Sequence, residues 1–133
     1  MNEPTWVLRS VVDAMHDAQL TEHGGAAGLR DAGLLESALA RPRNLHADGE
    51  TDLCTLTAAY AFGIARNHPF VDANKRTAFL AAYVFLRVNG LDLTADEVGV
   101  AVVMIAVAAG ETTEAAFADW LRANTRASAT ALR

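Results

Sequence analysis

The sequence has few of the residues that mark secreted, membrane or nucleic-acid-binding proteins. It contains one cysteine, Cys54, so no internal disulfide can form and the chain needs no oxidising compartment. The longest apolar run, from Val98 to Ala109, spans 12 residues, whereas a membrane span needs about 20. Acidic residues outnumber basic ones by 16 to 11, and DNA binding depends on Lys and Arg against phosphate. We therefore expect a cytoplasmic protein with no signal peptide, no membrane segment and no direct DNA binding.

What the sequence has in excess is alanine. Alanine occupies 28 of the 133 positions, and it is the strongest helix former. Apolar residues make up 52% of the chain, which is enough to build one hydrophobic core, and the length fits a single domain. The composition therefore predicts an all-α domain over residues 1–124. The Ser-, Thr- and Ala-rich residues 125–133 are expected to form a disordered tail.

Glycine and proline divide the chain into six expected helices. The first runs from Trp6 to Glu22, and a short second helix begins after an N-cap at Asp31 and is ended by Pro42. A polar loop from Arg41 to Thr51 follows. The other four helices are expected over Asp52 to Asn67, Asn74 to Asn89, Val98 to Ala109 and Thr113 to Asn124. The valine-rich third of these has the composition of a buried strand, but a capping box over Thr94 to Glu97 favours a helix. The predicted fold is a compact bundle of about six helices.

The segment from His68 to Ala78 interrupts this apolar pattern. A loop that runs into a helix N-terminus leaves backbone N–H groups unpaired and forms an anion site. Lys75 and Arg76 lie in the first turn of that helix, where cations are unfavourable unless a bound anion compensates them. His68 can accept a proton near neutral pH, and Asp72 can hold Mg²⁺ or orient a hydroxyl group. These residues fit a nucleotide phosphate site for phosphoryl or nucleotidyl transfer. The alternative is a solvated basic loop beside a structural histidine.

The same segment resembles the active-site motif of the Fic/Doc superfamily, and specifically its death-on-curing (Doc) branch. The broader Fic pattern reads His-x-Phe-x-Asp/Glu-Gly-Asn-Gly-Arg-x-x-Arg, and this sequence matches it at His68, Phe70, Asp72, Asn74 and Arg76. It departs from the pattern at Ala73, Lys75 and Phe79, and these departures are the Doc pattern. The stretches from His23 to Gly25 and from Arg30 to Leu39 also resemble Doc-type proteins, so the resemblance covers roughly Leu8 to Asn89.

The resemblance implies a role for each motif residue. His68 is the base that takes the proton from the target hydroxyl, and Asp72 is the carboxylate linked to Mg²⁺. Phe70 is the structural anchor of the motif. The phosphates of ATP are held by Asn74, Lys75 and Arg76.

The resemblance also implies a substrate and a partner. The family's prototype is a toxin kinase that transfers the γ-phosphate of ATP, with Mg²⁺, to a threonine of elongation factor Tu, and an antitoxin neutralises it. We accordingly expect a Phd-like antitoxin whose C-terminal segment folds into an apolar groove beside the motif. The alternatives are an AMP transferase of the Fic type and an inactive module that binds an antitoxin. The retained charges of His68, Asp72 and Lys75 argue against inactivity.

Other conspicuous residues receive structural interpretations. His16 and His23 share a helical face but lack partners at metal-ligand spacing, so we expect no metal site there. His46 is expected to be solvated. Cys54, Trp6 and Trp120 are expected in or against the core. The loop from Arg41 to Thr51 takes the place of the Fic flap that docks the target segment, with Arg43 and Asn44 as candidate contacts.

Overall fold

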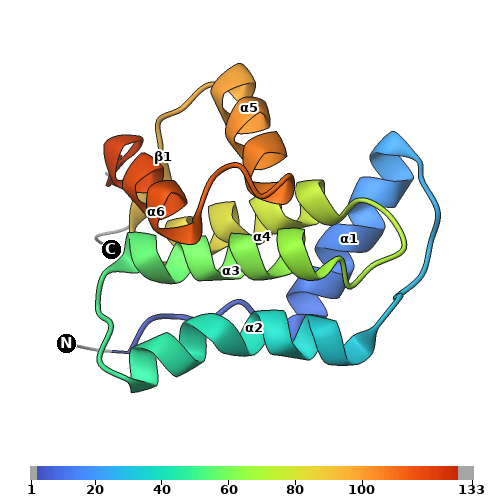
Figure 1. Ribbon diagram of the computed structural model, residues 1–133, viewed down its shortest axis with the longest axis horizontal. Coiled ribbons are helices and arrows are strands. Elements are labelled where there is room, and N and C mark those ends of the chain that lie inside the picture. Colours follow the sequence, from blue (N-terminus) through green and yellow to red (C-terminus); the bar gives the residue numbers. More distant parts are fainter. Residues whose placement is uncertain (1–2, 129–133) are drawn as a thin grey trace.

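The computed structural model describes residues 3–128, which form six helices and one short pair of strands (Figure 1). The helices are α1 (Arg9–His23), α2 (Ala32–Ala47), α3 (Leu53–Asn67), α4 (Asn74–Val88), α5 (Glu97–Ala108) and α6 (Glu114–Ala123). The strands are β1 (Leu91–Leu93) and β2 (Thr125–Ala127). The predicted all-α fold is confirmed. Within residues 3–128, none of the helices has the length and apolar character needed to cross a membrane.

Helix α3 is the centre of the bundle and packs against α2, α4, α5 and α6 (Figure 1). Small side chains let the neighbouring helices come close to it. Ala58, Ala61 and Ala65 are fully buried. A Cβ added at Gly63 would lie only 3.1 Å from both Cα and Cβ of Ala38 on α2. The high alanine content therefore serves close helix packing in addition to helix propensity.

The N-terminal segment before α1 packs against the middle of α3 and the C-terminal end of α4. Trp6 stacks on Phe85 with ring centroids 5.9 Å apart, and the backbone N–H of Val7 donates to the buried Tyr60 hydroxyl at 3.1 Å. Thr5 and Asn89 exchange two hydrogen bonds, from Thr5 N to Asn89 Oδ1 at 2.8 Å and from Asn89 Nδ2 to Thr5 O at 2.9 Å. Trp6 therefore packs against the core, as predicted.

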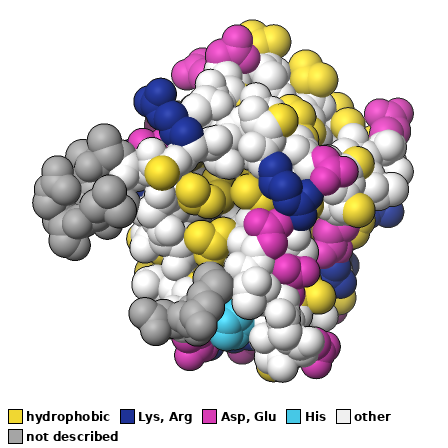
Figure 2. Space-filling model, turned by 90° about the vertical axis from the view of Figure 1, so that its left-hand side faces the viewer, with side chains coloured by type: hydrophobic (Ala, Val, Ile, Leu, Met, Phe, Trp, Pro, Cys, Tyr) yellow, Lys and Arg dark blue, Asp and Glu magenta, His cyan; other side chains and the backbone are white. Residues whose placement is uncertain are grey.

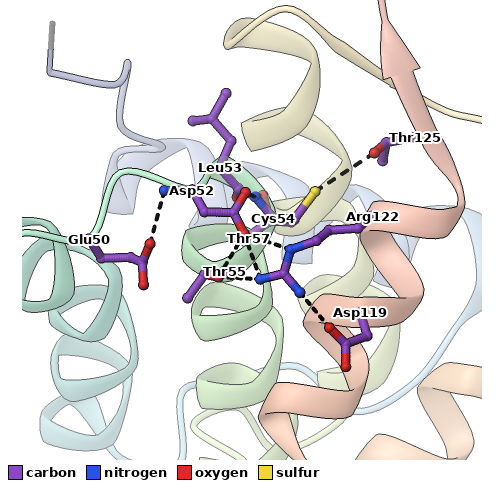
Figure 3. A network of polar contacts seen from close by, with 9 residues as sticks. All are labelled: Glu50, Asp52, Leu53, Cys54, Thr55, Thr57, Asp119, Arg122 and Thr125. Carbon is purple, nitrogen blue, oxygen red and sulfur yellow. Dashed lines mark hydrogen bonds and ion pairs between the residues drawn. The ribbon is translucent and has the colours of Figure 1, made fainter. Parts of the chain in front are cut away.

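Polar contacts join the N-terminus of α3 to α6 (Figure 3). Arg122 on α6 pairs with Asp52, the N-cap of α3, at 2.6 Å and donates to the Thr55 hydroxyl at 2.8 Å. Burial raises the pKa of Asp52, but the hydrogen bonds from Thr55 and Arg122 together with the charge of Arg122 outweigh it and lower that pKa. The buried Cys54 thiol lies 3.7 Å from the Thr125 hydroxyl, and desolvation raises its pKa. Cys54 is thus a core residue, as predicted.

The expected end of the second helix at Pro42 is wrong. Helix α2 continues through Pro42 to Ala47, so residues Arg41 to Ala47 are helical and only residues 48–52, which include the turn at Asp48 and Gly49, form the loop before α3. An internal proline costs about 3 kcal/mol, but here Pro42 is buried and Leu39 and Leu45 pack against the core on either side of it. The segment therefore forms no flap, and the Arg43 guanidinium lies 5.2 Å from the centre of the Trp6 ring.

Two further expectations are corrected near the C-terminal end. The predicted disordered tail begins at residue 125, yet Thr125–Ala127 pair antiparallel with Leu91–Leu93, and Ser128 N donates to Gly90 O at 2.8 Å. Residues 129–133 lie outside the described part. The cap of α5 is Asp96, which accepts from Gly99 N at 2.8 Å, in place of the predicted Thr94. The strand was missed because its partner is more than thirty residues away in sequence.

The face around the two ends of the described chain carries charges of both signs. In Figure 2, which views the molecule from this side, Lys and Arg side chains stand beside Asp and Glu side chains, and apolar side chains show between them. Short-range ion pairs of the fold include those of Arg122 with Asp52 and with Asp119.

Candidate active site

The motif begins where α3 ends. His68 is the C-cap of α3 and takes a left-handed conformation with φ of 50°, while its backbone N–H donates to Ile64 O at 3.2 Å. Pro69 disfavours a further helical turn, so the chain leaves α3 here as predicted. The His68 side chain is exposed and has no hydrogen bond to any of the residues 3–128. Its imidazole is therefore accessible from solvent.

Arg30 holds the backbone around His68. Its Nε donates to His68 O at 2.7 Å, its Nη2 donates to Asn67 O at 2.8 Å, and its backbone N–H donates to Pro69 O at 2.7 Å. The guanidinium also stands at the negative end of the α3 dipole, where a cation is favourable. Sequence reasoning assigns no role to Arg30, because nothing in its spacing links it to a residue 38 positions away.

Phe70 buries the middle of the loop against α1. Its side chain is 3% exposed, and its ring stacks on His16 with centroids 3.8 Å apart and an interplanar angle of 11°. The Nε2 of His16 also lies 2.9 Å from Asp72 O. His16 is buried here, whereas His23 is exposed and lines a groove at the other end of α1. The two histidines that share a predicted helical face therefore have different surroundings.

Asn74 closes the loop on itself. Its Oδ1 accepts from Phe70 N and its Nδ2 donates to Phe70 O, both at 3.0 Å, and the side chain is 7% exposed. Both polar atoms of the side chain are thus engaged within the loop. The predicted contact of Asn74 with phosphate is therefore left to its backbone N–H.

The carboxylate of Asp72 is exposed but held by two backbone N–H groups. Oδ1 accepts from Ala73 N at 2.8 Å and Oδ2 accepts from Ala26 N at 3.2 Å. These hydrogen bonds, with a smaller contribution from the charge of Arg76, hold the pKa of Asp72 below its usual range. Gly25 lies so close that a Cβ at this position would be 2.7 Å from Asp72 Oδ2. The group is ionised at neutral pH and points into a space bordered by a glycine.

An ionised carboxylate of this kind fits Mg²⁺ only in part. Residues 3–128 contain no group of three or more His, Cys, Asp or Glu side chains that could hold a metal ion. Mg²⁺ is commonly bound by one or two carboxylates together with substrate phosphates. Asp72 therefore suits a magnesium ion that arrives with a nucleotide.

Helix α4 begins without a side-chain cap. Its N-cap residue, Ala73, has a left-handed φ of 63°, and glycine, which the broader Fic pattern has here, adopts that conformation without strain. Among the described residues, the N–H groups of Asn74, Lys75 and Arg76 have no acceptor. Lys75 is exposed and Arg76 is half-buried. Three free N–H groups and two cations thus converge at one helix end, as an anion site requires.

A groove of about 530 Å³ leads away from this helix end between α1, α4 and α5. Lys75 and Arg76 stand at its polar end, and Phe79, which occupies the position of the final Arg of the Fic pattern, is part of its wall. The wall is otherwise mostly apolar and includes Leu80, Tyr83, Val100, Met104 and Ile105. The outer face of α5 continues this apolar surface, with Val98, Val102 and Ile105 more than half exposed.

The fold and this motif agree with comparisons against known proteins. The Fic/DOC family model matches residues 6–86, and the chain belongs to this family. It is similar to "Protein kinase doc" of Escherichia phage P1, with 40% identity over 110 residues that cover 82% of this chain and 86% of the relative. It is also similar to "Toxin Doc" of Mycolicibacterium smegmatis, with 47% identity over 75 residues that cover 55% of this chain and 58% of the relative. These relatives place the chain among the Doc-type toxins, as the sequence resemblance implied.

Proposed function

We propose that this chain is a toxin kinase that transfers the γ-phosphate of ATP to a serine or threonine hydroxyl of a target protein, such as elongation factor Tu. The observation that carries the proposal is a single short loop that begins at the exposed imidazole of His68 and ends at the uncapped N-terminus of α4 with its two cations. The relative named as a protein kinase, which aligns with 82% of the chain, supports the same class of reaction.

Each motif residue has a distinct part in this reaction. His68 accepts the proton of the target hydroxyl as the hydroxyl oxygen forms a bond to the γ-phosphorus. The bond between that phosphorus and the β,γ-bridging oxygen breaks, and ADP leaves with the electron pair. Lys75, Arg76 and the free N–H groups of α4 hold the phosphates, and Asp72 would hold the Mg²⁺ ion. When bound, that ion neutralises phosphate charge.

Lys75 favours γ-phosphate transfer over AMP transfer. Where the broader Fic pattern has glycine, this chain carries a long, exposed cation in the first turn of α4. That side chain fills space that a glycine leaves open above the helix end and adds a charge there. A nucleotide that avoids this space and uses the charge would lie reversed, with its γ-phosphate toward His68.

The experiment is paired labelling of a purified target with ATP that carries label at either the α or the γ position. We expect label from the γ position only, and we expect His68→Ala to abolish it. Lys75→Gly and Ala73→Gly each restore a glycine of the Fic pattern, but only Lys75→Gly removes a cation. Ala73→Gly is therefore the matched control for Lys75→Gly. Transfer from the α position would show an AMP transferase. No transfer from either position would indicate an inactive antitoxin-binding module.

We further propose that the groove between α1, α4 and α5 receives the C-terminal segment of a Phd-like antitoxin. A long apolar wall with cations at one end suits an amphipathic segment that carries acidic residues. The test is co-purification with the product of the adjacent reading frame. Ile105→Asp, in the groove, should release that product, whereas Val88→Asp, at an exposed apolar position outside the groove lining, should not. Equal retention by both variants would refute this site.

A further inference from the structure

A single buried imidazole connects helix α1 to the motif loop. His16 is 3% exposed, although histidine is usually at least partly solvated. The phosphoryl-transfer scheme uses no atom of this residue. The proposed reaction therefore does not explain why His16 is buried beneath the loop that carries Asp72.

The geometry gives His16 two separate contacts with the loop. A carbonyl oxygen can only accept a hydrogen bond, so Nε2 of His16 carries the proton and donates to Asp72 O at 2.9 Å. The face of the same ring lies against Phe70, with centroids 3.8 Å apart. One side chain thus fixes two residues of the loop, Asp72 by a directional bond and Phe70 by stacking.

The carbonyl oxygen of Asp72 has no other hydrogen-bond donor among residues 3–128, although Val71 N donates to Gly28 O at 3.0 Å on one side of it and Ala73 O accepts from Thr77 N on the other. The two hydrogen bonds from the Asn74 side chain fix the backbone of Phe70, two residues before Asp72. The Asp72 carboxylate itself rests on the N–H of its neighbour Ala73 and on the N–H of Ala26, which belongs to an exposed segment with glycines on both sides. Neither of these hydrogen bonds fixes the carbonyl group of Asp72, whereas the imidazole of His16 does so.

We propose that His16 is the positioning residue of Asp72, which holds that residue's backbone so that its carboxylate faces the nucleotide site. The consequence for metal binding rests on the proposed kinase function, whereas the positioning itself does not. Hydrogen-bond partners that orient a metal ligand typically change metal affinity by about 10- to 100-fold when they are removed.

Two substitutions separate the two contacts of His16. His16→Phe keeps an aromatic ring against Phe70 but removes the donor. His16→Gln keeps an N–H donor of similar reach but removes the ring. A role in packing alone would make the Gln variant the more impaired of the two, whereas the positioning role makes the Phe variant the more impaired.

The first measurement is amide hydrogen exchange by NMR at Ala26 and Ala73, whose N–H groups donate to Asp72. We expect exchange at least about tenfold faster in His16→Phe and near wild-type exchange in His16→Gln, with Thr77 on α4 as the internal control. Unchanged exchange in the Phe variant, or equal acceleration in both variants, would overturn the proposal. If His16→Phe does not fold, the wild-type protein still provides a test. The Nε2 proton of His16 must be protected from solvent exchange, and its absence would also overturn the proposal.

The second measurement is the affinity for Mn²⁺ in the presence of a non-hydrolysable ATP analogue. We expect about 10- to 100-fold weaker binding in His16→Phe alone, and no additional loss when the same change is made in an Asp72→Asn background. If His16→Phe weakens Mn²⁺ binding equally in the wild-type and the Asp72→Asn backgrounds, His16 acts independently of Asp72, and this result would overturn the proposal. If the wild-type protein binds neither nucleotide nor Mn²⁺, the proposed kinase function fails, and amide exchange alone still decides the role of His16.

Discussion

The two adjacent glycines after α1 provide a matched pair of substitutions that tests the position of Asp72. Gly24 and Gly25 both have positive φ, 76° and 124°. Replacement of either by alanine therefore costs backbone strain of about 1–3 kcal/mol. For a chain of this size, we expect each variant to lose about 4 °C in Tm per kcal/mol.

The two glycines differ in what a new methyl group would meet. At Gly24 nothing lies within 4 Å of an added Cβ, whereas at Gly25 the Cβ would stand 2.7 Å from Asp72 Oδ2 and 3.1 Å from a methyl carbon of Leu20. Gly25→Ala must therefore push the Asp72 carboxylate away from Ala26 N. We expect this variant to lose activity to about the level of Asp72→Asn, while Gly24→Ala keeps nearly all of its activity.

The assay is transfer of γ-label to a target, together with growth inhibition on induced expression and thermal melts of all three variants. The melts matter because they separate loss of fold from loss of the site. If Gly24→Ala loses as much activity as Gly25→Ala at equal Tm, strain in the loop explains both results and the contact with Asp72 does not. Full activity in Gly25→Ala would refute the assigned position of Asp72.

Three further predictions follow from named contacts. His68→Ala should lower transfer by about 10²- to 10⁴-fold with little change in Tm, because the imidazole is exposed and is the proposed base; transfer above a tenth of wild type would contradict this role. Gly63→Ala should cost about 1–2 kcal/mol of unfolding free energy in denaturant titrations, because its methyl would lie 3.1 Å from the backbone of Ala38 and the gain in helix propensity offsets only part of the overpacking. Arg122→Gln should cost about 0.5–1 kcal/mol at pH 7. Since the pKa of Asp52 is lowered in the folded state, the part of this stability difference that comes from the Asp52 pair is present above pH 3.8 and is lost as the pH falls through the folded pKa of Asp52, whereas the hydrogen bond to Thr55 does not titrate. A stability difference that does not narrow in acid would refute the pairing.

The sequence predicts the helical elements well where the signal is local. The N-cap at Asp31 accepts from Leu34 N at 3.0 Å as predicted, and α3 ends at Asn67, two residues before Pro69. Pro42 misled the prediction because burial of α2 against α3 outweighs the local cost of proline, and burial is not visible in a local window. Strand β2 is not predicted from the sequence for a similar reason, since its three residues pair with a segment that is far away in the sequence.

The motif residues were identified from sequence, but their supporting contacts were not. His68, Asp72, Lys75 and Arg76 follow from the spacing within one short segment and from the family resemblance. The residues that hold this segment come from α1 and from the loop before α2, and include Arg30, which contacts the backbone alone. Contacts between a side chain and a distant backbone carbonyl leave no pattern in a single sequence.

The two ends of the described chain meet at the same corner of the fold. Thr5 is tied to Asn89, and Ser128 is tied to the next residue, Gly90. In Figure 1 both ends lie at the left, whereas the loop between α3 and α4 lies at the right. The order of the helices along the chain can therefore be changed without changing how the helices pack in space. A circular permutant that joins the ends by a short linker and opens the chain at the Asp48–Gly49 turn would keep every helix and the whole motif. An affinity tag or surface tether at either end would leave the His68 face open to its substrate.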